Sequence, residues 1–177
     1  MDGVVVREVE RHEAELAPIL ADLHLQAIRS GMALGHVEPL DVEALRAEWR
    51  NEVEALGEAG RSLVVAERAR DVVAMALLVP STAANARHRA EVQRVAVATA
   101  FRGSGIGRRL MAAVEDRAAA NGITLLYLTT HAESDACAFY EACGYTQLGV
   151  MPDYSTRPDG TLAPGAFYYR LLTARRP

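Results

Sequence analysis

The stretch Phe-Arg-Gly-Ser-Gly-Ile-Gly-Arg-Arg-Leu, residues 101–110, decides the fold, because it joins an apolar run typical of a strand to an alanine-rich run typical of a helix. Gly103, Gly105 and Gly107 carry no Cβ, so the backbone can adopt positive φ and direct successive N–H groups into one concavity at a helix start. Neighbouring arginines add full positive charges. The stretch therefore predicts a site for a ligand that carries several phosphates.

Two better-known phosphate loops differ from this stretch. A Walker A loop ends in Gly-Lys-Ser/Thr, whereas here Arg108 and Arg109 follow Gly107. A dinucleotide loop has the spacing Gly-x-Gly-x-x-Gly, which the three glycines do not match. What remains is Arg-x-x-Gly-x-Gly, from Arg102 to Gly107, which resembles motif A of the GNAT family of N-acetyltransferases. The alternative is a glycine-rich turn without function.

Composition narrows the class of protein. The chain has 177 residues, half of them hydrophobic, and no apolar run long enough to cross a membrane, so we expect one soluble domain over residues 1–177. The N-terminus lacks the features of a signal peptide, which favours a cytoplasmic protein. The net charge is −4, which disfavours nucleic acid as a partner. Cys137 and Cys143 are predicted to be free, buried thiols, and no metal site is expected.

Hydrophobic periodicity predicts alternating strands and helices. The predicted strands cover residues 4–9, 61–67, 71–79, 89–98, 123–130 and 166–173, with one more starting at 144; the predicted helices cover 11–30, 41–56, the run after the glycine-rich turn to 121, and 133–143. Residues 149–165 are predicted to form a long irregular loop with a turn at Pro158–Gly160. Strict alternation places Glu91, Gln93, Val95 and Val97 on one face of their strand.

This order of elements is similar to that of the GNAT family, and the resemblance covers nearly the whole chain. It implies an α+β fold: a mostly antiparallel twisted sheet of about seven strands, flanked by four helices, with splayed central strands. The tracts Glu91–Val97 and Ala138–Tyr145 are similar to the family's cofactor strand and tyrosine helix. The tracts Arg89–Arg94, Gly149–Leu162 and Phe167–Arg170 resemble its tabtoxin-resistance-type branch, which acetylates small amines and, in its name-giving member, detoxifies an antibiotic.

The resemblance implies that acetyl-CoA is the donor and that two segments hold it. The backbone of Val95, Ala96 and Val97 is expected to pair with the pantetheine arm like an added strand. The pyrophosphate is expected at the glycine-rich turn, in contact with Arg102, Gly103, Ser104, Gly105, Ile106, Gly107 and Arg108. Many relatives have an asparagine where this chain has Glu133, so Ser134 is a candidate replacement.

Acetyl transfer also needs a group that deprotonates the amine and one that protonates the departing thiolate. Glu91 is the leading candidate base, and an ordinary strand carboxylate or a substrate-binding group is the alternative. His131 and Glu133, just beyond the end of the next strand, are secondary candidates for the base. Relatives of this branch commonly have an acidic residue where this chain has Thr129, and His131 is the candidate to replace it because the two share a face of the strand. Tyr140 resembles the family's general acid, whereas its place on an apolar stripe equally suits a core tyrosine.

The acceptor pocket is expected between Gly31–Pro39 and Pro152–Thr161. Its candidate linings are Met32, His36, Glu38, Asp153 and Tyr154. The expected acceptor is a small cationic amine. The alternatives are a protein lysine or N-terminus, and a domain that binds acetyl-CoA without turnover. A homodimer is expected because exposed apolar edge strands need covering.

Overall fold

The computed structural model describes residues 3–32, 34–157 and 160–172. Its seven strands form one sheet in the order β1-β2-β3-β4-β5-β7-β6. The strands are β1 (Val4–Glu8), β2 (Ser62–Arg68), β3 (Asp71–Pro80), β4 (Arg89–Val97), β5 (Leu125–His131), β6 (Thr146–Thr156) and β7 (Leu162–Leu171); the helices are α1 (Ala17–Arg29), α2 (Val42–Glu54), α3 (Ile106–Ala120) and α4 (Ala136–Ala142). The predicted α+β fold with seven strands and four helices is confirmed.

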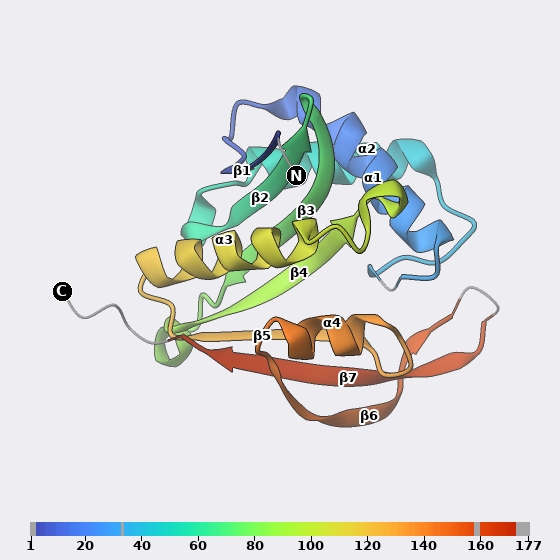
Figure 1. Ribbon diagram of the computed structural model, residues 1–177, viewed down its shortest axis with the longest axis vertical. Coiled ribbons are helices and arrows are strands. Elements are labelled where there is room, and N and C mark those ends of the chain that lie inside the picture. Colours follow the sequence, from blue (N-terminus) through green and yellow to red (C-terminus); the bar gives the residue numbers. More distant parts are fainter. Residues whose placement is uncertain (1–2, 33, 158–159, 173–177) are drawn as a thin grey trace.

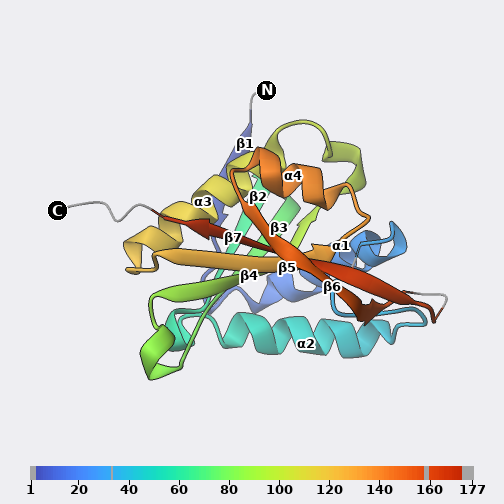
Figure 2. The same cartoon turned by 90° about the horizontal axis from the view of Figure 1, so that it is seen from below.

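The sheet lies between two helical layers (Figures 1 and 2). One face packs against α3 and α4, and the other face packs against α1 and α2. Alternating residues of β2 show the reason, because Val64 joins the α3/α4 cluster while Leu63 and Val65 join the α1/α2 cluster. The central strands are therefore apolar on both faces, as continuous rather than alternating hydrophobic runs predict.

The sheet opens between β4 and β5. These two strands pair in parallel over Arg89–Glu91 and Leu125–Tyr127, whereas the other strand pairs are antiparallel. Beyond Glu91, the described part of β4 has no ladder partner on the β5 side. Figure 1 shows the two strands starting together and diverging toward the end of β4. The predicted splay of the central strands is thus present.

Residues 149–165 do not form the irregular loop that the sequence predicts. Most of this tract belongs to the long hairpin of β6 and β7, which pairs through Val150↔Ala166 and Thr156↔Leu162. Its glycines and prolines are typical of a loop, but Gly149 and Pro152 lie in β6, an edge strand that tolerates them because one side of its backbone needs no partner. Residues 158 and 159 of the predicted turn, and Thr173, lie outside the described residues.

Smaller corrections concern α1 and the cysteines. The first helix begins at Ala17 rather than at Arg11, after a short 3-10 turn, and Pro18 occupies its first turn. Both cysteines are free but only half-buried. Among the described residues, no helix is long and apolar enough to cross a membrane.

A buried histidine joins α1 to α2. His24 has no exposed surface, and its Nδ1 accepts a hydrogen bond of 3.1 Å from the indole N–H of Trp49. Burial, with smaller contributions from Arg94 and His36, lowers the pKa of His24 from 6.5 to about 4. The imidazole is therefore neutral in the folded protein at neutral pH.

This depressed pKa predicts a loss of stability in acid. The unfolded chain binds a proton at His24 below about pH 6.5, whereas the folded protein resists protonation down to about pH 4. The free energy of unfolding should therefore fall as the pH drops from 6.5 to 4, and His24→Gln should flatten that fall. Urea unfolding at pH 7 and at pH 5 measures this change in the free energy of unfolding. His12→Gln, at an exposed position, serves as the control. If both variants changed the pH dependence of the free energy of unfolding equally, the effect would not come from the buried His24.

Candidate functional site

The glycine-rich turn places the start of α3 beside the open edge of β4. Gly103 and Gly105 adopt φ of 73° and 83°, as the sequence predicts, and Gly105 is the N-cap residue. No side chain caps the helix there, and the backbone N–H of Arg109 is bonded to the Gly105 carbonyl. The first N–H groups of the helix, at residues 105–108, have no intrahelical partner and are available to bind an anion.

Gly107 has a different role from the one predicted. It lies inside α3 without positive φ, and a Cβ at this position would lie 3.0 Å from Cε2 of Phe139 and 3.5 Å from Cγ2 of Val97. The glycine therefore allows α3 to approach both α4 and β4 closely. The prediction that all three glycines supply positive φ is wrong for this one.

Gly107→Val should lower the free energy of unfolding by about 1–3 kcal/mol, because the added methyl groups overpack the contact with Phe139. Thermal unfolding measures the loss. Gly149→Ala is the matched control, since Gly149 has ordinary φ and a Cβ added there would have no neighbour within 4 Å. A Gly107→Val variant as stable as Gly149→Ala would show that the close approach is not needed.

The arginines of the turn divide into two kinds. Arg102 donates to the Val97 carbonyl at 3.1 Å and to Oγ of Ser30 at 2.8 Å, so its side chain joins β4 to the end of α1. Arg109 donates to the Val4 carbonyl at 2.8 Å. Arg108 is exposed in the first turn of α3, and Ser104 donates to the Phe101 carbonyl at 2.5 Å. Of the predicted cationic contacts, Arg108 is the side chain best placed for an anion.

A β-bulge in β4 breaks the predicted alternation. Opposite β3, the register shifts by one residue at Arg94, whose φ is 52°. Before the bulge, Ala90 and Val92 pack toward α3 and α4, so Glu91 and Gln93 face the α1/α2 side. After it, Val95 and Val97 pack toward α3 and α4, and Ala96 packs into the α1/α2 cluster. The prediction that Glu91 shares a face with Val95 and Val97 is therefore wrong.

The backbone beyond the bulge points to the open edge. The N–H of Ala98 donates to the Val73 carbonyl of β3, so alternation directs the polar groups of Ala96 toward β3 and those of Val97 away from it. The bond from Arg102 to the Val97 carbonyl agrees with this direction. Val97 thus presents backbone groups that an extended ligand can reach, and Ala96 does not.

Glu91 borders a hollow on the α2 side of the sheet. The hollow has a volume of about 480 Å³ and is lined by Ala55, Glu58, Ala59, Arg61, Val79, Pro80, Ser81, Thr82, Glu91 and Tyr127. Oε2 of Glu91 accepts a 2.9 Å hydrogen bond from Gln93, and Tyr127 lies opposite in the ladder. Burial and the charge of Glu91 raise the pKa of Tyr127. Glu91 is the last residue of β4 that pairs with β5, so it lies where the strands part.

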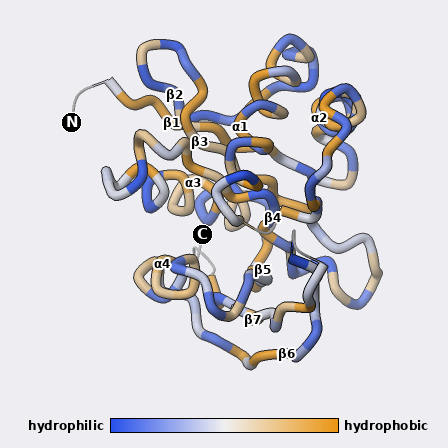
Figure 3. The backbone as a smooth tube through the Cα atoms, turned by 90° about the vertical axis from the view of Figure 1, so that its right-hand side faces the viewer, coloured by the Kyte–Doolittle hydropathy of each residue, from blue (hydrophilic) through white to orange (hydrophobic). Residues whose placement is uncertain are grey.

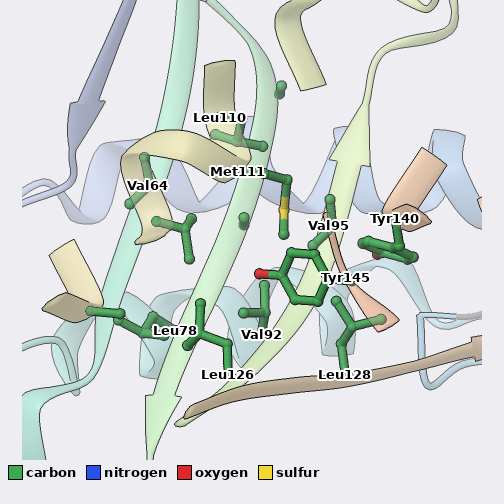
Figure 4. Packing of buried hydrophobic residues seen from close by; sticks show 14 of the residues in the cluster. Val64, Leu78, Val92, Val95, Leu110, Met111, Leu126, Leu128, Tyr140 and Tyr145 are labelled. Carbon is green, nitrogen blue, oxygen red and sulfur yellow. The ribbon is translucent and has the colours of Figure 1, made fainter. Parts of the chain in front are cut away.

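Tyr140 lies on the other face of the sheet, in the same cluster as Val95 (Figure 4). Its side chain is 7% exposed and its ring packs against Phe139, Tyr145 and Tyr168 at centroid distances of 5.2–6.0 Å. Burial raises the pKa of its phenol, so the hydroxyl stays protonated at neutral pH. A protonated phenol is able to donate a proton.

His131 ends β5 and is half-buried on the same face as Glu91. Burial and Arg157 lower its pKa, while Glu133 opposes them, so the imidazole is mostly neutral near pH 7. Glu133 is bonded to Arg157 at 2.6 Å. Ser134 donates to the His131 carbonyl at 2.7 Å. The hydroxyl of Ser134 is therefore directed to the backbone at the end of β5.

The predicted acceptor linings make contacts with the protein itself. His36 bonds Glu48 at 3.0 Å, and Glu38 bonds Arg29 at 3.0 Å. The Sδ atom of Met32 contacts Arg102. In β6, Asp153 has φ of 53°, and Tyr154 packs edge-on against Phe167 at 5.0 Å. Of these five, Asp153 and the 44% exposed Tyr154 lie on the accessible hairpin.

The described site thus combines a sheet opened between two parallel strands with an uncapped helix start beside the opening. The acetyltransferase (GNAT) family model matches residues 25–145. The chain belongs to this family.

Two solved structures share the fold, and a curated protein shares part of the sequence. Ribosomal-protein-alanine N-acetyltransferase from Brucella melitensis superposes with a TM-score of 0.80 at 25% identity, over 95% of this chain and 99% of that chain. The putative acetyltransferase yncA from Salmonella typhimurium, solved with its cofactor acetyl-CoA, gives 0.80 at 18% identity over 99% and 98%. N-alpha-acetyltransferase 80 from Mus musculus is 48% identical over 62 residues, which are 35% of this chain and 18% of the mouse protein.

Proposed function

We propose that the protein transfers the acetyl group of acetyl-CoA to a primary amine by direct attack in a ternary complex. One observation carries this proposal: the uncapped start of α3 lies beside the edge of β4 that has no ladder partner on the β5 side beyond Glu91. The first suits a pyrophosphate, and the second suits the amides of a pantetheine arm. Bound there, acetyl-CoA supplies an activated acetyl group as a thioester.

The two candidate catalytic groups approach that opening from opposite faces of the sheet. Glu91 faces α2, where it accepts the proton that the acceptor ammonium must lose before its nitrogen attacks the carbonyl carbon. Tyr140 lies on the α4 side with Val95. Its phenol donates a proton to the thiolate sulfur as the C–S bond breaks. Because the groups lie on different sides, the amine and the thiol do not compete for one position.

For the acceptor, we propose a small cationic amine as the first candidate, on the acidic surroundings of Glu91 and the aromatic ring of Tyr154. The narrower resemblance to the tabtoxin-resistance-type branch stays a prediction. A protein N-terminus is the second candidate. It is favoured by the names of the mouse and Brucella relatives, which act on N-terminal and ribosomal-protein alanine amines.

Release of CoA thiol from acetyl-CoA separates these candidates. The acceptors to compare are small diamines and amino-acid-like amines, peptides with a free N-terminus, and the same peptides with a blocked N-terminus and one lysine. Turnover with small amines supports the first candidate, and turnover with free N-termini alone supports the second. Acetyl-CoA binding without turnover on any acceptor would contradict the enzymatic proposal.

We also propose that two copies associate through β6. This edge strand is exposed along nearly its whole length, and residues 146–152 contain no charged side chain to discourage pairing. Its exposed apolar side chains include Leu148, Val150 and Met151. Figure 3 shows hydrophobic colouring along part of the β6 backbone. An antiparallel pair of identical strands about a twofold axis is self-complementary, so a second copy is the expected partner.

Val150→Glu should convert a dimer into a monomer, because it places two carboxylates at the paired edges. Light scattering at micromolar concentration measures the mass. Leu171→Glu, at a 71% exposed position in β7, is the control and should leave the dimer intact. A monomeric wild-type protein would refute the association.

A further inference from the structure

Arg94 holds an unusual backbone conformation inside a central strand. The described non-glycine residues with positive φ are Ala59, Ala69, Arg70, Arg94 and Asp153. Of these, Ala69 and Arg70 form a hairpin turn, Ala59 lies in a short 3-10 turn, and Asp153 lies in the edge strand. Side chains rarely adopt this conformation without compensation from their surroundings.

The compensation comes from one face of α2. The Arg94 guanidinium forms an ion pair with Glu48 and lies 4.0 Å from Oε2 of Glu52. It also lies 4.8 Å from the ring centroid of Trp49, in cation–π geometry. The Arg94 side chain is only 16% exposed. A mostly buried charge so arranged fixes the position of the guanidinium, and through it the backbone at residue 94.

The same contacts reach the segment between α1 and α2. The second carboxylate oxygen of Glu48 lies 3.0 Å from Nε2 of His36, whose ring packs edge-on against His24 at 5.0 Å. Trp49 in turn donates to His24. The bulge of β4, helix α2 and the segment around His36 are thus joined by one continuous group of polar and aromatic contacts.

The consequence of the bulge appears at the open edge of β4. Without the extra residue, Val95 would face α1 and α2 together with Glu91, and its backbone polar groups would exchange sides with those of its neighbours. We propose that Arg94 is a positioning residue: its ion pair with Glu48 and its packing on Trp49 impose the bulge that presents the backbone after it to acetyl-CoA. The inference rests on the proposed function. The contacts of Arg94 with α2 lie on the side of the sheet that Glu91 faces, and they fix the edge of β4 proposed to bind acetyl-CoA.

Two substitutions separate the backbone effect from loss of the charge. Arg94→Met and Arg94→Gly leave the same two carboxylates on α2, but glycine adopts positive φ freely and methionine does not. Arg94→Met should weaken acetyl-CoA binding by about tenfold, with a matching rise in KM for acetyl-CoA and little change in kcat at saturation. Arg94→Gly should retain affinity within about threefold of wild type. Isothermal titration calorimetry measures binding, and circular dichroism verifies folding.

Arg46→Met is the control, because the ion pairs of Arg46 are with Glu43 of α2 and Asp22 of α1, so this variant should bind acetyl-CoA as the wild type does. Equal affinities for Arg94→Met and Arg94→Gly, whether both wild-type or both weak, would overturn the inference. If wild-type protein fails to bind acetyl-CoA, the proposed function itself fails, and the two failures are distinguished.

Discussion

Glu91→Gln should lower kcat by about 100-fold at neutral pH, with the affinity for acetyl-CoA unchanged. The amide keeps the size of the side chain and can still bond to Gln93, but it cannot accept a proton. In the variant the acceptor ammonium must lose its proton to water, and the fraction of neutral amine rises with pH. The rate of the variant should therefore recover toward that of the wild type in alkaline buffer, as steady-state thiol release at several pH values would show.

Glu58→Gln is the matched control for this prediction. Glu58 lines the same hollow as Glu91, so its removal changes the local charge equally, but it belongs to the segment after α2 and not to the strand that opens. Its kcat should stay within about threefold of wild type. A Glu91→Gln variant with wild-type kcat, together with a His131→Gln variant that has lost activity, would transfer the role of base to His131.

Tyr140→Phe should lower kcat by about 10- to 100-fold while the protein remains folded and binds acetyl-CoA normally. The aromatic packing with Phe139, Tyr145 and Tyr168 is retained in the variant, because only the hydroxyl is removed. The lost group is the one expected to donate to the leaving sulfur. Comparing kcat with a poor thiol leaving group and with CoA would show a larger defect for the more basic thiolate.

Tyr145→Phe provides the control within the same aromatic cluster. The Tyr145 hydroxyl is buried without a hydrogen-bond partner among the described residues, so its removal should leave kcat unchanged and should not destabilise the fold. If Tyr140→Phe also keeps full turnover, Tyr140 is a core tyrosine, as its burial alone would suggest.

Some candidate residues can be placed from the sequence with reasonable precision. The glycine-rich turn, the strand before it and the helix after it are predicted correctly, because each has a local signal in φ preference or hydrophobic period. The tyrosine on α4 is also placed in the right helix. Residues 149–165 of the β6–β7 hairpin are predicted as a loop, because their pairing depends on a partner strand and on a position at the edge of the sheet.

Arg94 is the residue whose contribution the sequence does not reveal. Strict alternation along β4 hides a bulge, and the one available signal, a charged residue in a strand that also contains Glu91 and Gln93, is equally typical of a strand position that faces solvent. Its partners Glu48 and Glu52 are one helical turn apart on α2, but nothing in their spacing reveals which strand they face.

The sequence by itself determined the glycine-rich turn and the strand and helix on either side of it, because glycine conformations and hydrophobic periods act over a few neighbouring residues. Only the tertiary structure decided which faces of the sheet Glu91, Val95 and Tyr140 occupy. That choice depends on a single extra residue in β4, held by contacts from a helix more than forty positions away in the chain. One residue of register reverses every side chain that follows it, and a local pattern cannot report such a shift.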